Sequence, residues 1–169
     1  MHTLRDETDQ AAVSIDDFER YLSSLKEDSE GALSAITDYY AKLKAAEKSI
    51  RDIGIESVSN RYSPAISELY GVIGEAYTTL LSLPIDVVKV DELISKLKTT
   101  GDEVLHNIAH DYQQMLLAEA SILYANRDRQ HLGEINTLLL QTEGLYFSGD
   151  FARSYEETVK ALRRIRGQE

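Results

Sequence analysis

The residues with the clearest chemical potential are His106 and His110, with Glu103 and Asp111 nearby in the sequence. On a helix, a spacing of four residues puts both imidazoles on one face, where they could hold a zinc ion. However, the glutamate of a His-Glu-x-x-His hydrolase is missing, and both histidines fall outside the apolar seam of their predicted helix. We therefore interpret them as part of an exposed polar face and predict no metal and no cofactor.

Acidic clusters are the second candidate for chemistry, at Asp16-Asp17-Glu19 and Glu27-Asp28-Glu30. Carboxylates act as general acid and base only in a partly dry pocket that separates their pKa values. A heptad helix instead presents such groups to water, with Lys26 interleaved here. The sequence also contains no cysteine, no glycine-rich phosphate loop and no nucleophile elbow. We predict that the chain is not an enzyme, and a helical-bundle metalloenzyme is the least favoured of three hypotheses.

The segment Glu119 to Arg129 reads EASILYANRDR and combines an aromatic ring with polar and basic groups. Its candidate recognition residues are Tyr124, Asn126, Arg127 and Arg129. Asn and Arg at this position could stabilise the end of a helix by hydrogen bonding. They could equally form a binding patch, because arginine offers a planar fork to carboxylates and tyrosine is enriched at binding hot spots. The residues alone leave both interpretations open.

A second basic group lies near the C-terminus. It consists of Lys160, Arg163, Arg164 and Arg166. Cations in the last turn of a helix interact favourably with the helix dipole, which explains most of this cluster. A weak contact with an acidic lipid or an acidic partner is the alternative.

These residues must be positioned by long helices, because an apolar seven-residue repeat runs through the first third of the chain. One position of the repeat is filled by Ile15, Leu22, Ile36, Leu43 and Ile50. The other position is filled by Phe18, Leu25, Ala32, Tyr39, Ala46 and Ile53. Ser29 is the polar exception. This period keeps one narrow seam facing a neighbouring helix, as in coiled coils, so we predict a helix over about 8–53.

Further along the chain, we predict a loop over 54–62, with Gly54 as a helix cap and Ser63-Pro64 as the start of a second helix over 63–82. A third helix is predicted over 87–130. Its seam consists of Val90, Ile94, Leu97, Val104, Ile108, Met115, Ala118 and Ile122, and Gly101 is a weak point inside it. Two short helices then meet at a Gly149-Asp150 turn. We predict an all-α, elongated antiparallel helical bundle with spectrin-like repeats: a three-helix rod over 1–132, capped by a helical hairpin over 133–169.

Composition limits the classes of partner and the cellular compartments that are compatible with this chain. The 169 residues carry a formal net charge of −11, which argues against nucleic acid because phosphate contacts need clustered Lys and Arg. No apolar run approaches the roughly 18 residues that can span a bilayer, and the charged N-terminus is unlike a signal peptide. Absence of cysteine excludes a disulfide framework. These features are typical of a cytoplasmic protein.

The C-terminal half resembles the septation ring formation regulator family, EzrA, of low-GC Gram-positive bacteria. The matching residues before the hairpin are Leu83-Pro84-Ile85-Asp86, Val90, Ala118-Glu119, Ile122, Tyr124-Ala125-Asn126-Arg127 and Arg129. Those in the hairpin are Ile135, Leu139, Glu143, Tyr146-Phe147, Gly149-Asp150-Phe151, Ser154, Thr158 and Leu162. Good correspondence covers about 80–165, whereas 1–60 match only as a generic coiled coil.

The resemblance implies a cytoplasmic rod of spectrin-like repeats that contacts the tubulin-like division protein FtsZ and other division proteins. It also implies an N-terminal membrane anchor that is absent here, so that this chain would be a soluble C-terminal fragment of a protein acting at the septal membrane. Family members carry a Gln-Asn-Arg patch needed at the septum. Asn126 and Arg127 match its last two residues, whereas Leu123 stands at the position expected to be Gln and Asp128 where an aromatic is usual.

The resulting hypothesis is a non-catalytic regulator of septal ring assembly. The alternative is a generic coiled-coil adaptor or a self-assembling helical scaffold unrelated to division. In that case the seam of 15–53 would pair within one chain or with another copy, as a homo-oligomer.

Overall fold

The computed structural model describes residues 2–129, 133–165 and 167, and within these it leaves undescribed the side chains of 2–18, 22, 128, 133–135 and 165. The described residues form helices without a strand, as predicted for an all-α bundle. The α-helices are α1 (His2–Ile53), α2 (Glu56–Leu81), α3 (Val87–Lys96), α4 (Asp102–Ala125), α5 (Gly133–Ser148) and α6 (Phe151–Ile165). A π-helical turn, Leu97–Gly101, joins α3 to α4, and a 3-10 turn, Asn126–Asp128, follows α4.

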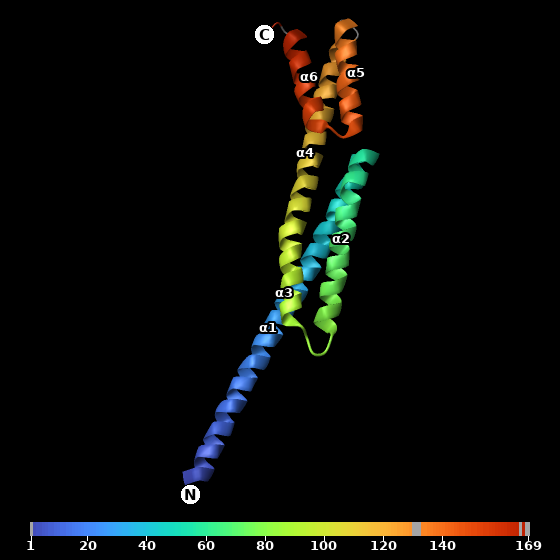
Figure 1. The fold of residues 1–169 in the computed structure, drawn as a ribbon. Coiled ribbons are helices and arrows are strands. Elements are labelled where there is room, and N and C mark those ends of the chain that lie inside the picture. The colour runs from blue at the N-terminus through green and yellow to red at the C-terminus, as the bar shows by residue number, and fades with distance from the viewer. Residues whose placement is uncertain (1, 130–132, 166, 168–169) are drawn as a thin grey trace.

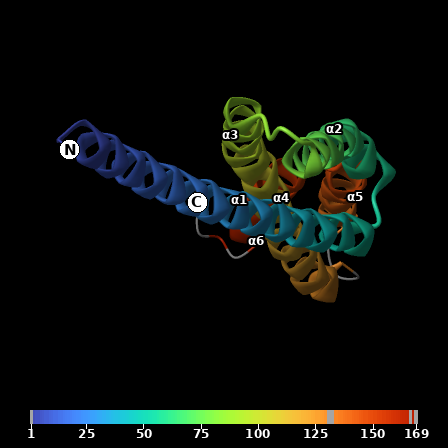
Figure 2. The same cartoon turned by 90° about the horizontal axis from the view of Figure 1, so that it is seen from below.

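The helices form two three-helix bundles placed end to end, with α4 common to both (Figure 1, Figure 2). In the first bundle α2 returns beside α1, and α3 continues through the π turn into α4. In the second bundle α5 and α6 pack against the C-terminal half of α4. The N-terminal half of α1 extends beyond the α2–α3 loop, so the molecule is elongated. Among the described residues, no helix has both the length and the apolar content to cross a membrane.

The seam of α1 is buried along its C-terminal half, as its repeat predicts. The buried members are Ala32, Ile36, Tyr39, Leu43, Ala46, Ile50 and Ile53. Leu25 and Ser29 are half-buried, and the side chains of Ile15, Phe18 and Leu22 lie outside the described residues. The helix begins at His2, earlier than predicted, and ends at Ile53. Gly54 follows it with a φ of 67°, the left-handed conformation in which glycine commonly caps a helix.

The start of α2 differs from the prediction, because the expected loop over 54–62 is helical from Glu56 onward. Ser63-Pro64 therefore lies inside the helix and does not begin it. Val58 and Tyr62 are buried and extend the apolar stripe back toward the turn, so tertiary packing outweighs the loop preference of the intervening serines and asparagine. Pro64 removes one donor, but Asn60 and Pro64 are both exposed, so water can satisfy the freed carbonyl.

The predicted helix over 87–130 is interrupted by the π turn at Leu97–Gly101. Gly101 is buried beneath the ring of Tyr39, and a Cβ at this position would lie 3.1 Å from Tyr39 Cε1. The Tyr39 hydroxyl donates a hydrogen bond of 2.8 Å to Asp102 Oδ1. Gly101 is thus the place where α1 approaches the third helix closely, rather than only a weak point.

A second tyrosine–aspartate contact links α2 to α4. The hydroxyl of Tyr62 and the guanidinium of Arg61 both donate to Asp111 Oδ2, each at 2.8 Å. Asp111 occupies the slot in the seam between Ile108 and Met115 that the apolar pattern leaves vacant. Burial, reinforced by the hydrogen bond to the neighbouring aspartate, raises the pKa of Tyr39 to about 12 and that of Tyr62 to about 12.

The two bundles meet where the α5–α6 turn touches the start of α2. Gly149 has a φ of 83°, and a Cβ there would lie 2.9 Å from Val58 Cγ2. Ser57 Oγ donates to the carbonyl of Ser148 at 2.8 Å. Only glycine combines this backbone conformation with so close an approach. The turn predicted at Gly149-Asp150 therefore also fixes how the second bundle is placed on the first.

We predict that Gly101→Ala destabilises the protein by about 1–3 kcal/mol, as overpacking does. Tyr39 cannot move aside easily, because its ring is buried and its hydroxyl is held by Asp102. The matched control is Gly71→Ala in α2, where a Cβ meets nothing within 4 Å. That variant should gain up to about 1 kcal/mol from the better helix propensity of alanine. Urea unfolding measures both, and equal free energies of unfolding for the two variants would contradict the close approach at Gly101.

We also predict that the free energy of unfolding falls as the pH rises from 10 to about 12. The folded chain holds the phenol protons of Tyr39 and Tyr62 more tightly than the unfolded chain does, because their pKa values are raised from 10.0 to about 12. The stabilisation is complete below pH 10 and is lost across this window, with a contribution from each tyrosine. In Tyr39→Phe the loss should be smaller by one such contribution, and stability curves of parent and variant that run parallel across the window would contradict this.

Candidate partner-binding site at the end of α4

Arg129, one of the four candidate residues, ties the end of α4 to α5. Its guanidinium donates from Nη1 and Nη2 to the two carboxylate oxygens of Glu143, at 2.8 and 3.3 Å. Nε donates to Asn136 Oδ1 at 2.8 Å, and Nη1 also donates to Asn126 Oδ1 at 3.1 Å. The Arg129 and Glu143 side chains are only 29% and 24% exposed, so solvent weakens this ion pair less than a surface pair. Arg129 and Asn126 therefore have the structural role that the sequence left open.

Tyr124 and Arg127 are the candidates that face solvent. Tyr124 is 43% exposed, and Arg127 lies over it with Cζ 5.6 Å from the ring centroid. A guanidinium over a tyrosine ring at this distance makes a cation–π contact. Leu123 beside them is 62% exposed. These three side chains form an exposed surface of apolar, aromatic and cationic groups at the end of the helix.

A small apolar cluster holds this surface in place. Ala125 at the end of α4 and Leu139 in α5 are fully buried, and Leu162 in α6 packs against them. The last turn of α6 consequently lies beside the end of α4 and brings Arg163 and Arg164, both exposed, to the same end of the molecule. Lys160 pairs with Glu157 at 2.8 Å, and Arg166 lies outside the described residues. This end of the rod thus carries the exposed side chains of Arg127, Arg163 and Arg164 in a chain whose net charge is −11.

The other residues considered for chemistry are dispersed. His106 and His110 are exposed, and the described residues contain no group of three or more His, Cys, Asp or Glu that could hold a metal ion. Glu27, Asp28 and Glu30 are exposed on α1, and the side chains of Asp16 and Asp17 are not described.

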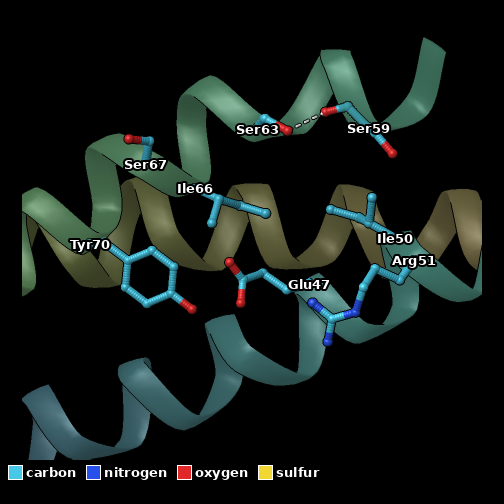
Figure 3. Close-up of a pocket in the computed structure, with 8 residues that line it drawn as sticks. All are labelled: Glu47, Ile50, Arg51, Ser59, Ser63, Ile66, Ser67 and Tyr70. Atoms are coloured by element: carbon cyan, nitrogen blue, oxygen red, sulfur yellow. Dashed lines mark hydrogen bonds between the residues drawn. The ribbon is translucent and has the colours of Figure 1, made fainter. Parts of the chain in front are cut away.

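A groove of about 400 Å³ opens between α1 and α2, with Glu47, Arg51 and Tyr70 on its walls (Figure 3). Glu47 is the one carboxylate among its lining residues, and it pairs with Lys44 at 3.2 Å. The groove is open to solvent and presents neither a nucleophile with an adjacent base nor two facing carboxylates. Burial raises the pKa of Tyr70, whose hydroxyl has no hydrogen-bond partner among the described residues. We assign no reaction to this groove.

Sequence reasoning missed the polar residues that fix the helices. Asp111 could have been found as the polar occupant of a seam position. Asp102 gives no such signal, because its role depends on Tyr39 from another helix. The partners of Arg129 on α5, Asn136 and Glu143, were likewise not foreseen.

The fold and this surface define an elongated helical-bundle protein whose candidate recognition side chains lie on an exposed rod end rather than in an enclosed pocket. A family model described as "Septation ring formation regulator, EzrA" matches residues 1–167. The chain is also similar to a septation ring formation regulator EzrA of Oceanobacillus iheyensis, with 32% identity over 82 residues. That alignment covers 48% of this chain and 14% of the relative. No solved structure matches. The chain belongs to the EzrA family of septation ring formation regulators, as the resemblance indicated.

We predict that Arg129→Ala lowers the free energy of unfolding by about 2 kcal/mol, because it removes hydrogen bonds to a partly buried carboxylate. Arg127→Ala removes the same charge from an exposed side chain two residues away and should change stability by less than about 0.5 kcal/mol. Urea unfolding followed by circular dichroism compares the two. If both variants lose the same stability, Arg129 does not hold the α4–α5 junction.

Proposed function

We propose that this chain takes part in non-enzymatic regulation of septal ring assembly, by contacting FtsZ and other division proteins. Membership of a septation ring regulator family supports the role in division. The resemblance of 80–165 to the family's C-terminal region supports the proposed contact with FtsZ. The elongated bundle supports a mechanism in which rigid helices hold a recognition surface at a distance from the point of attachment.

The observation that carries the proposal is that the candidate residues at the end of α4 differ in their structural environment. Arg129, with Asn126, fixes the turn after the helix, while Tyr124 and Arg127 are left on the surface. A fixed backbone reduces the entropy that these two side chains lose when they bind. Arg127 offers a planar fork to a carboxylate of the partner, and Tyr124 offers an aromatic anchor beside it.

The proposed setting is the cytoplasmic face of the membrane at the division septum. Attachment to that membrane through an N-terminal anchor is what the resemblance to the family implies. The proposal needs no metal, cofactor or nucleic acid.

The test is co-sedimentation of the purified chain with FtsZ filaments. Tyr124→Ala and Arg127→Glu should each reduce the bound fraction, because they remove the exposed anchor and reverse the exposed charge. Asn126 is not a suitable target, since it accepts a hydrogen bond from Arg129 and its loss would disturb the turn. Lys48→Glu is the matched control: it makes the same charge change at an exposed position of α1.

Each variant is first shown by circular dichroism and urea unfolding to be as stable as the parent. Equal sedimentation of parent, Tyr124→Ala and Arg127→Glu would remove the end of α4 from the proposed mechanism. No sedimentation of the parent with FtsZ at any concentration would contradict the FtsZ contact itself.

A further inference from the structure

The C-terminal half of α4 is apolar on two opposite sides. One side carries Met115, Ala118 and Ile122, which are buried in the bundles. The other side is exposed and carries Leu116, Leu117, Ala120, Leu123 and Tyr124. With about 100° between successive residues, the exposed five fall within one arc of roughly 120° centred opposite the buried three. An ordinary surface helix has a polar outer side, so this second apolar line is unexplained by the fold of a single chain.

The same side of α4 becomes a groove toward its N-terminus. Ala109 lies seven residues, or one heptad, before Leu116. It lines an open hollow of about 430 Å³ between α1 and α4. Its wall on α1 is formed by Lys42 and by three small residues, Ala45, Ala46 and Ser49. One side of the molecule thus presents projecting leucines near the C-terminus of α4 and a hollow with small residues near its N-terminus.

We propose that this side of α4 is an interface with a second copy of the chain, packed antiparallel about a two-fold axis that passes near residues 114 and 115. In this register Ala109 of each copy faces Ala120 of the other, and small residues at the crossing allow close approach of the two helices. Leu123 of each copy enters the hollow beside Ala45 and Ala46 of the other. In a two-fold arrangement this contact between Leu123 and the hollow occurs twice, because an isologous interface uses the same surface of both copies.

Charge complementarity supports the second copy as the occupant. In the same register Arg127 of one copy faces Asp102 of the other, once at each end of the interface. Both side chains are exposed. A parallel arrangement would instead place Arg127 against Arg127 and would leave the hollow empty. The net charge of −11 on each chain opposes association over long distances, but charges more than about 8 Å apart are largely screened at physiological ionic strength.

The proposal is independent of the contact with FtsZ, although Tyr124 and Arg127 belong to both surfaces. A substitution at Leu116 distinguishes the two proposals, because this residue lies in the middle of the interface and three helical turns from Arg127 along α4. A substitution at Leu116 leaves the side chains proposed to meet FtsZ unchanged, and a self-association experiment contains no FtsZ.

Disulfide trapping tests the orientation and the register, since the natural chain has no cysteine. Ala109→Cys and Ala120→Cys are prepared as separate proteins and oxidised alone and as a mixture. A disulfide needs Cα atoms within about 7 Å. The mixture should give a cross-linked dimer of one chain of each variant. Either variant alone should give little, because its two cysteines would be about 16 Å apart along the paired helices.

Sedimentation equilibrium over a micromolar concentration series tests the association itself. The parent should show a mass that rises with concentration toward that of a dimer. Leu116→Asp should weaken association at least tenfold, because it buries a charge in the interface. Leu140→Asp is the matched control: Leu140 is 56% exposed on α5, outside the interface, and the charge change is the same. This control should associate like the parent.

A parent that stays monomeric across the series would overturn the proposal, and so would equal weakening by Leu116→Asp and Leu140→Asp. Cross-linking of each cysteine variant with itself, as efficiently as in the mixture, would overturn the antiparallel register. A monomer whose α4 surface is covered only when another protein is added would assign this surface to a different occupant and would equally refute the second copy.

Discussion

The structure depends on the fixed register of the one helix that both bundles share. The C-terminal half of α4 must bury its apolar seam against α5 and α6, while its N-terminal half buries the same seam against α1 and α2. Apolar contacts alone tolerate sliding by a heptad, whereas a tyrosine hydroxyl can reach a given carboxylate in one register only. Asp102, bound by Tyr39, and Asp111, bound by Tyr62, therefore specify where α4 lies against α1 and α2.

That register sets the position of the rod end. The α5–α6 turn rests on Val58 at the start of α2, and Arg129 ties the end of α4 to α5, so the second bundle is held at both of its ends. Tyr124 and Arg127 are placed by this framework rather than by a loop. Because α4 is continuous from the π turn to Ala125, the two bundles are joined by a single helix rather than by a loop.

Much of the fold was predictable because burial follows the seven-residue repeat. The seams of α1 from Ala32 onward and of the third helix are buried where the sequence placed them, apart from Val104, which is half-buried. The start of α2 was not predictable from local pattern, since only Val58 and Tyr62 mark it among loop-forming residues. The π turn places Gly101 against the ring of Tyr39, which belongs to another helix. The four candidate residues remain a prediction as a binding site. The pairing of Arg129 with Glu143, fourteen positions further on, and the exposure of Tyr124 and Arg127 depend on side-chain directions that spacing does not specify.

The two apolar sides of α4 have different physical consequences. The buried side contributes to folding of a single chain, and its loss would be felt as lower stability. The outer side contributes little to that stability, because Leu116, Leu117 and Leu123 keep about half or more of their surface in water. Their hydrophobic free energy is realised only when something covers them. Since Arg127 lies at the end of the same side, a second copy and a different protein would compete for it, and the concentration of the chain would then decide which contact forms.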